Sequence, residues 1–167
     1  NGYFDQYHPE KGCLSVPSDV SVIRKLVEVL KPYMKFEPTG YVGEKDEKGR
    51  RQGKGLMVYE NGNKYEGDFQ KGKASGRGGY NWANGEVYDG EWKAGVKEGY
   101  GMWRGIFGDS YLGQWKNSKA DGHGVHQWKN GDRYEGSWVN CLKHGKGTDI
   151  FACGDVYSGN YAFGKPD

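Results

Sequence analysis

The chain has 167 residues, of which 30 are glycine, 15% are aromatic and only 35% are apolar. Aliphatic side chains are too few for an ordinary globular core, so the aromatic rings must be buried in some other arrangement. The 24 basic and 22 acidic residues are interleaved and leave a formal net charge of +2. This pattern excludes the concentrated basic surface of a nucleic-acid binder, and we expect no nucleic-acid partner.

The cysteines and the absence of apolar runs bear on the compartment. Cys13, Cys141 and Cys153 are odd in number and widely spaced, which is typical of reduced thiols inside a cell rather than of a disulfide framework. No apolar run approaches the roughly 20 residues of a membrane span, and no signal-peptide pattern opens the chain. We therefore expect a cytoplasmic protein, although a start at Asn1 leaves open a removed targeting segment.

Residues 1–40 form an N-terminal segment with one predicted helix, over residues 19–31. Ser18 is suited to the N-cap, and Pro32 ends the helix. The apolar stripe of this helix consists of Val20, Ile23, Leu26, Val27 and Leu30. A helix this short is marginal alone in water, so the stripe must rest on another surface. A cap over the edge of the following β-structure is favoured, and a helix docked in a groove is the alternative.

From residue 41 onward, one pattern of landmarks repeats every 23 residues. A Tyr-x-Gly-x-aromatic motif comes first, a Gly-x-Gly pair follows 11 and 13 residues after the tyrosine, and a further glycine stands at 20 residues. The motifs are Tyr65-Gly67-Phe69, Tyr88-Gly90-Trp92, Tyr111-Gly113-Trp115, Tyr134-Gly136-Trp138 and Tyr157-Gly159-Tyr161, and Tyr41-Gly43 precedes them by 24 residues. A fixed period with three landmarks indicates a repeat architecture.

Each period contains two strand-like runs joined by turns. Large and charged residues alternate in Lys64–Phe69, which predicts a strand with one apolar face, and Arg77–Trp82 is the returning strand. A turn is predicted between them at Lys71-Gly72-Lys73, and Asn84-Gly85 leads to the next unit as a favoured hairpin dipeptide. Glycine normally weakens strands, so we expect rings to lie flat over the bare backbone. Units of this kind are stabilised mainly by their neighbours.

These motifs resemble the MORN repeat (membrane occupation and recognition nexus) over residues 41–167, with about five units and a truncated sixth. The resemblance implies a mostly β protein, an elongated single-layer antiparallel β-hairpin array. Lys45 stands where an aromatic is expected, and Ser118 and Cys141 replace the turn glycine. In the third unit Gly105 and Phe107 replace tryptophan and asparagine. This change predicts a notch or a looser turn, and the looser turn is favoured.

The repeat pattern stops inside a unit. Gly164 falls at the turn position of the sixth unit, and the next Gly-x-Gly pair would begin one residue past Asp167. We therefore expect the chain to be a piece of a longer protein.

No constellation predicts catalysis, a cofactor or a metal. Cys141 and His144, with His123 and His126 one repeat earlier, lack the second closely spaced ligand pair of a structural zinc site. None of the Gly-x-Gly pairs opens a helix as a phosphate-binding loop does. The recurring acidic residues indicate a solvated face, because a repeat gives many copies of one environment rather than two unlike carboxylates at one place. The acidic residues are Glu66, Asp68, Asp89, Glu91 and Glu135.

Two surfaces are candidates for binding. The first is a partner-binding groove of returning-strand residues, and the fixed first-strand rings are expected to be mainly structural. The groove set is Tyr80, Trp82, Trp103, His126, Trp128 and Phe151. The second is a ridge of turn lysines that could attract an anionic membrane by about 1 kcal/mol each, or could simply keep edges soluble. The ridge set is Lys71, Lys73, Lys93, Lys97, Lys116, Lys119 and Lys143.

The favoured hypothesis is a non-catalytic scaffold that binds a helix or extended peptide of a partner in the aromatic groove. The resemblance implies cytoskeletal tethering, membrane-contact organisation or regulation of an attached enzyme, and a homodimer through a terminal repeat stays open. The first alternative is phosphoinositide or acidic-membrane binding through the lysine ridge. A second alternative is a regulatory module of an enzyme whose catalytic domain lies outside this chain.

Overall fold

The computed structural model describes residues 39–167, so the helix predicted over residues 19–31 lies outside the described residues. Within the described range the regular structure is entirely β. The strands are β1 (Gly40–Lys45), β2 (Arg51–Val58), β3 (Lys64–Gln70), β4 (Lys73–Asn81), β5 (Val87–Lys93), β6 (Val96–Arg104), β7 (Ser110–Lys116), β8 (Lys119–Gln127), β9 (Arg133–Val139), β10 (Leu142–Ile150), β11 (Val156–Ala162) and β12 (Lys165–Pro166).

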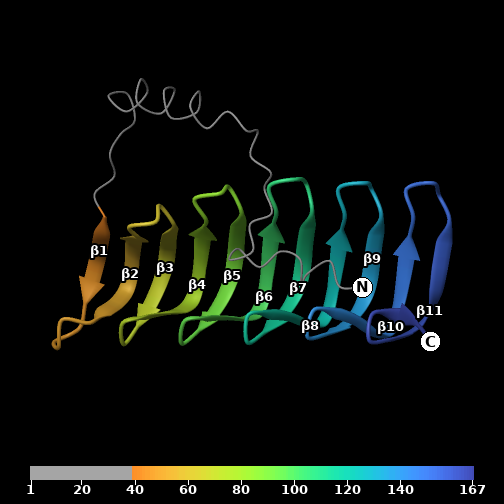
Figure 1. Cartoon of the computed structure of the whole chain (residues 1–167). Helices are drawn as coiled ribbons and strands as arrows, with labels where there is room; N and C mark the ends of the chain where they lie inside the picture. The colour runs from red at the N-terminus through yellow and green to blue at the C-terminus, as the bar shows by residue number, and fades with distance from the viewer. Residues whose placement is uncertain (1–38) are drawn as a thin grey trace, which may run out of the picture. The chain divides into compact units, whose positions relative to one another are not determined.

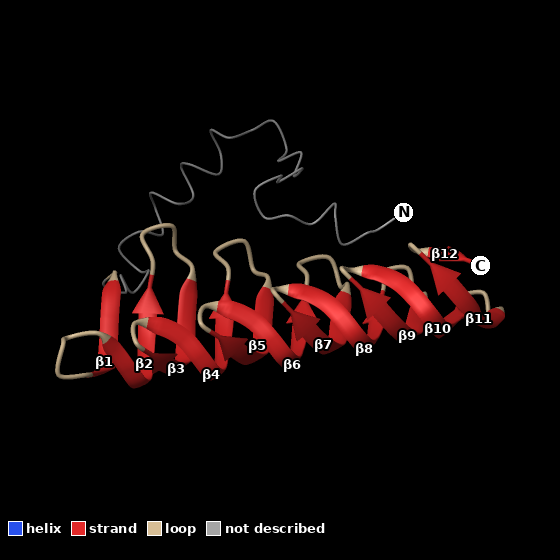
Figure 2. Cartoon of the chain, turned by 90° about the horizontal axis from the view of Figure 1, so that it is seen from below, coloured by secondary structure: helices blue, strands red, loops and turns tan. Residues whose placement is uncertain are grey.

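The twelve strands form one open sheet in which spatial order equals chain order. Every neighbouring pair is antiparallel, so the chain runs up and down across the sheet as a continuous series of hairpins (Figure 1). Viewed from below, the strands follow one another in a single row (Figure 2). The prediction of a mostly β, single-layer antiparallel hairpin array is confirmed for the described residues.

Two-residue turns close the second to sixth units at one end of the strands, whereas residues 46–50 connect β1 to β2 in the first unit. Lys71 and Gly72 both have positive φ, as do Ala94 and Gly95, and this is the combination that suits a right-twisted hairpin. Ser118 and Cys141 adopt φ of 63° and 65° at the glycine position. The turn amide also reaches the preceding unit, since the N–H of residue 95 donates to the carbonyl of residue 74 at 2.8 Å. The turns therefore join units as well as strands.

Longer connections lead from one unit to the next at the opposite end. The carboxamide oxygen of Asn84 accepts the N–H of Glu86 at 3.0 Å, and Asn130 does the same for Asp132. In the third unit Phe107 offers no such acceptor, and the closing bond from the Gly108 N–H to the residue 105 carbonyl lengthens to 3.5 Å. The equivalent bonds elsewhere measure 2.8–3.0 Å. The looser turn favoured from the sequence is therefore present.

The core is an aromatic ladder that runs across the sheet. Tyr65, Tyr88, Tyr111 and Tyr134 are at most 1% exposed. Each ring meets its neighbours edge to face, with centroids 5.0–5.7 Å apart and interplanar angles of 79–89°. In spatial order the ladder is Tyr41, Phe69, Tyr65, Trp92, Tyr88, Trp115, Tyr111, Trp138, Tyr134, Tyr161 and Tyr157. Contacts within and between units alternate, so stability depends on the whole array.

The two glycines of each Gly-x-Gly pair have different roles. Gly76 has a φ of +105° at a bulge in β4, a conformation that side-chain-bearing residues rarely adopt. Gly78 leaves room for the Tyr65 ring, since a Cβ there would lie 2.6 Å from Tyr65 Cζ. The Tyr65 hydroxyl donates to the Asp68 carbonyl at 2.8 Å. The predicted stacking of rings on glycine is therefore the packing rule of the core.

Candidate partner-binding site

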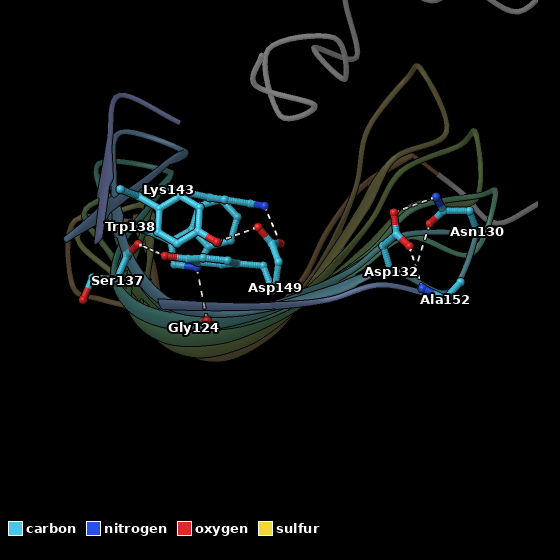
Figure 3. Close-up of polar contacts among 10 residues, drawn as sticks. Gly124, Asn130, Asp132, Ser137, Trp138, Lys143, Asp149 and Ala152 are labelled. Carbon is cyan, nitrogen blue, oxygen red and sulfur yellow. Dashed lines mark hydrogen bonds and ion pairs between the residues drawn. The ribbon is translucent and has the colours of Figure 1, made fainter. Parts of the chain in front are cut away.

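The sheet face that carries the aromatic ladder is called the inner face. Strand register places the ladder tyrosines and the variable residues in one row, because Tyr80 lies opposite Tyr88 and His126 lies opposite Tyr134. Seen along the array, the sheet is curved, and Trp138, Lys143 and Asp149 lie on its concave side (Figure 3). The indole N–H of Trp138 donates to the Gly124 carbonyl at 3.1 Å. A ladder residue is thereby fixed to the preceding unit.

The structure places the six predicted groove residues in two kinds of position. Trp103 and His126 are 6% and 3% exposed, and they occupy the ladder row itself. Tyr80, Trp82 and Trp128 are half-buried, and Phe151 is 40% exposed where its turn begins. The rings associate in pairs, with centroids 4.6 Å apart for Tyr80 and Trp82 and 4.3 Å apart for His126 and Trp128.

Burial changes the ionisation of His126. Its pKa is lowered to about 4 by burial and by the positive charge of Lys143. His126 is therefore neutral at physiological pH, and it adds a flat polar ring rather than a charge to the inner face. The Trp103 indole N–H donates to the buried Glu86 carboxylate at 3.4 Å, so the inner face also holds an acidic group.

Lys97 differs from the ridge predicted from the sequence, because its ammonium group is turned onto the inner face. Its Nζ lies 4.6 Å from the ring centroid of Trp115, 5.2 Å from Tyr88 and 5.4 Å from Trp82. An ammonium over ring faces is held by cation–π attraction. Burial lowers the pKa of Lys97 to about 8. Lys97 therefore belongs to the aromatic site and not to the turn edge.

Lys143 repeats this arrangement two units later. Its Nζ lies 4.7 Å from the ring centroid of Tyr134 and 4.9 Å from that of Trp128. It also pairs with the Asp149 carboxylate at 2.5 Å (Figure 3). The Tyr161 hydroxyl donates to the same carboxylate at 2.7 Å. At Lys97 the neighbouring acidic group is the buried carboxylate of Glu86, which favours the charged form of the lysine.

The repeat contains a signal that could have located both lysines. They belong to a column spaced by 23 residues, which reads Arg51, Ala74, Lys97, Ala120 and Lys143. Where the column has lysine, the residue fifteen positions earlier is Trp82 or Trp128, and where it has Ala120 that residue is Gly105. A cation and a tryptophan therefore occur together, and the turn-based interpretation from the sequence missed this pairing.

The other five predicted ridge lysines are exposed at or beside the two-residue turns. We call them the lysine edge, which consists of Lys71, Lys73, Lys93, Lys116 and Lys119. The turns between β3 and β4, β5 and β6, and β7 and β8 bring them to the same end of the strands. The ridge is thus smaller than the sequence predicted, because Lys97 and Lys143 are absent from it.

Two of the recurring acidic residues accept hydrogen bonds from the backbone instead of only facing solvent. The Asp68 carboxylate accepts the N–H of Arg77 at 2.9 Å, and Glu91 accepts the N–H of Tyr100 at 2.5 Å. The Lys54 ammonium forms a salt bridge with the Asp68 carboxylate. This contact and the hydrogen bond from the Arg77 N–H hold the pKa of the Asp68 carboxyl below its usual value. These carboxylates satisfy amides exposed by the bulge, a role that the sequence pattern alone did not reveal.

Metal and membrane features were also sought in the described range. Among residues 39–167, no three His, Cys, Asp or Glu side chains are grouped so as to hold a metal ion. In the same part of the chain, no helix combines the length and the apolar character needed to cross a membrane.

The fold defines a class of protein, the single-sheet β-hairpin repeat array. The family model of the MORN repeat matches residues 41–64, 65–87, 88–105, 111–133 and 134–152, and the chain belongs to this family. MORN repeats are non-catalytic modules that generally serve protein or membrane interaction.

Similarity to individual proteins is limited. The chain is similar to a solved structure of the SAS-4 (dCPAP) TCP domain in complex with a proline-rich motif of Ana2 (dSTIL) of Drosophila melanogaster. That match has 15% sequence identity and a TM-score of 0.44, and it covers 74% of this chain and 68% of the other. No curated protein matches the chain by sequence.

Proposed function

We propose that residues 41–167 form a protein-interaction scaffold that receives a helix or an extended peptide of a partner on the inner face. The supporting observation is that half-buried aromatic rings lie beside ammonium groups held over ring faces, all on one face of a single-layer sheet. Tyr80, Trp82 and Trp128 supply apolar area, and the ammonium groups of Lys97 and Lys143 lie among them. Large rings on a sheet face are typical anchors for a partner.

The variable positions give the inner face its specificity. The ladder rings recur in every unit, whereas a more accessible column spaced by 23 residues changes from Trp82 to Gly105, Trp128 and Phe151. Consecutive units are two strands apart, or about 10 Å. A bound helix would advance six or seven residues per unit at about 1.5 Å each. An extended peptide would advance about three residues. Each unit thus reads a different part of a linear ligand.

A peptide-display selection on the whole chain tests this proposal. Clones selected on the wild type are counter-selected on a variant with both Trp82→Ala and Trp128→Ala, and circular dichroism checks its fold. We expect a class of clones that loses binding to this variant but keeps it on the matched variant with Trp82→Phe and Trp128→Phe. If every clone binds the alanine variant as well as the wild type, the proposal is wrong.

Anionic lipid binding by the lysine edge is the second candidate. The observation in its favour is the exposure of five lysines at one end of the strands. It ranks second because Lys97 and Lys143 are directed into the aromatic site instead. Co-sedimentation with liposomes at about 0.15 M salt removes weak nonspecific attraction. Pelleting with phosphoinositide-doped but not neutral liposomes, lost with Lys73→Glu, Lys93→Glu and Lys119→Glu combined, would promote this candidate. Protein that stays in the supernatant would exclude it.

A further inference from the structure

The ammonium group of Lys97 is surrounded by ring faces and has no direct counterion. It lies within 5.4 Å of the ring centroids of Trp82, Tyr88 and Trp115. Burial raises the pKa of the Tyr88 hydroxyl, so this ring is uncharged. Among residues 39–167, no carboxylate lies within salt-bridge distance of the Lys97 ammonium. Ring faces attract a cation, but they do not replace the hydrogen bonds that water offers to its three N–H groups.

The charged groups near Lys97 only partly offset its burial. Burial is the main influence and lowers the pKa of Lys97 to about 8, although Cys141 and Glu86 favour the charged form. Cys141 lies in the turn between β9 and β10, and Glu86 directly precedes β5. The Glu86 carboxylate also accepts the Trp103 indole N–H at 3.4 Å and the Asn84 amide N–H at 3.1 Å. The amine of Lys97 is therefore neutral at physiological pH in a larger fraction of molecules than the amine of an ordinary lysine.

Lys143 occupies the equivalent position two units later but has a counterion. Its Nζ pairs with the Asp149 carboxylate at 2.5 Å. Six residues after Lys97, where this aspartate would correspond, the chain has Trp103. A carboxylate in contact with an ammonium stabilises the protonated form, which is not nucleophilic. The two lysines thus share an environment of rings and differ in the availability of the nitrogen lone pair.

We propose that Lys97 is a site of covalent acylation, in which its neutral amine attacks the carbonyl carbon of an activated acyl donor such as a small thioester. A bond forms between Nζ and the acyl carbon, and the carbon–sulfur bond of the donor breaks. The leaving thiolate takes up the proton that the nitrogen releases, so the products are an amide and a free thiol. A lysine that is desolvated among apolar side chains is an activated nucleophile of this kind.

Acylation changes the inner face at one unit. The amide product is uncharged, so the positive charge over Trp82 and Trp115 is lost. The acyl group adds apolar atoms beside the same rings, while Lys143 keeps its ion pair with Asp149. This inference does not rest on the binding of a partner to the inner face, because its test needs no partner. Either proposal can therefore fail alone.

Competitive labelling of the whole chain measures this reactivity. The folded chain is treated with a limiting amount of the acetyl thioester of N-acetylcysteamine at about pH 7.5, where a lysine of ordinary pKa is almost fully protonated. The remaining amines are labelled with an isotopically heavy acetyl reagent after unfolding, and mass spectrometry of the peptides gives the acylated fraction of each lysine.

We expect Lys97 to react about ten-fold faster than the exposed Lys93 and Lys119, because its larger neutral fraction outweighs the lower nucleophilicity of a less basic amine. Its rate should rise with pH through a midpoint near pH 8. Acylation of Lys97 that is no faster than that of Lys93 would overturn the proposal.

Asp149→Asn supplies the matched control, because it leaves Lys143 among its rings without the carboxylate. Circular dichroism checks the fold of this variant. We expect slow acylation of Lys143 in the wild type and several-fold faster acylation in the variant, with the rate at Lys97 unchanged. If Lys143 reacts as fast as Lys97 in the wild type, the ion pair does not distinguish the two lysines and the assignment to Lys97 is wrong.

Trp82→Ala tests the physical cause of the reactivity. Removing this ring exposes the Lys97 amine to water and should move the midpoint of its pH profile upward, while the exposed Lys93 in the same sample serves as the reference. An unchanged midpoint in a folded variant would show that burial among the rings does not activate Lys97, which contradicts the proposal.

Discussion

The two faces of this one sheet obey different rules, although both come from the same strands. The inner face repeats one set of contacts, in which each ladder tyrosine covers a glycine and meets the aromatic ring of the next unit. The opposite face of the sheet, called the outer face, varies from unit to unit and is largely exposed. With no second layer among residues 39–167, the ladder takes the place of a core. Stability should therefore depend on the inner face, and the outer face should tolerate change.

The strongest test of this contrast compares the same substitution on the two faces. Tyr111 is fully buried, and its hydroxyl donates to the Gln114 carbonyl at 2.9 Å, whereas Tyr100 is 59% exposed. Tyr111→Ala should lower the free energy of unfolding by about 4 kcal/mol. Tyr100→Ala should change it by less than about 0.5 kcal/mol. Urea unfolding followed by circular dichroism measures both, and equal costs would contradict the division of roles.

Acid should weaken the inner face through His126. Its folded pKa of about 4 lies below the ordinary histidine pKa of 6.5, so between these values the unfolded state binds more protons and stability falls as the pH falls. The stabilisation is fully present above pH 6.5. Its loss by about pH 4 should approach 3 kcal/mol.

His126→Tyr isolates this contribution, because Tyr80 occupies the equivalent position in another unit. Carboxylates titrate in both proteins, so the difference between their unfolding free energies, measured at several pH values, reports on the histidine. A pH-independent difference would show that His126 is protonated as easily in the folded state as in the unfolded state.

Adjacent glycines should separate the two faces on a single strand. A Cβ at residue 78 would lie 2.6 Å from Cζ of Tyr65, whereas the nearest atom to a Cβ at residue 79 is 3.8 Å away. Gly78→Ala should destabilise by about 2 kcal/mol through overpacking. Gly79→Ala should be neutral or stabilise by about 0.5 kcal/mol, since alanine costs less chain entropy. If the Tyr65 ring does not occupy the space beside residue 78, thermal and urea unfolding should show equal losses of stability in the two variants.

The regular parts of this fold were predictable, because a 23-residue period fixes strand, turn and packing together. Ring-on-glycine packing followed from the regular occurrence of glycines between aromatic residues in the predicted strands. The cation sites were not predicted, because Lys97 follows a turn in sequence and resembles an ordinary solvated lysine. Its environment depends on Trp82 and Trp115, which belong to the units on either side. The sequence pattern of a single repeat does not predict the contacts that its residues make with neighbouring repeats.

The apolar residues at the centre of the outer face were missed for a related reason. Met102, Leu112 and Val125 belong to three different strands and become neighbours only through cross-strand register. In the sequence each is a lone apolar residue between polar ones, which is normal for a surface. Writing the repeats in register aligns Met102 with Val125, but it does not place Leu112 between them and does not show that Met102 and Leu112 are exposed.

A smaller effect should sharpen the contrast by showing where the outer face does contribute to stability. Asp68 accepts the Arg77 N–H at 2.9 Å, whereas Glu66 on the same face is exposed two residues earlier. Asp68→Ala should cost about 1 kcal/mol, because it leaves a bulge amide without its acceptor. Glu66→Ala should have almost no effect. Equal results for these two variants in urea unfolding would show that the bulge amide does not need the carboxylate.

The smallest effect concerns the turns that both faces share. Ala94 has a φ of 50°, a left-handed conformation that disfavours alanine, while Asn117 and Asn140 occupy the same position in other units. Asparagine tolerates this region and is preferred in such hairpin turns. Ala94→Asn should therefore raise the free energy of unfolding by about 0.5 kcal/mol. Asn117→Ala is the matched reverse change and should lower it by a similar amount. If both substitutions shift the urea midpoint in the same direction, side-chain contacts rather than backbone conformation determine stability at these turns.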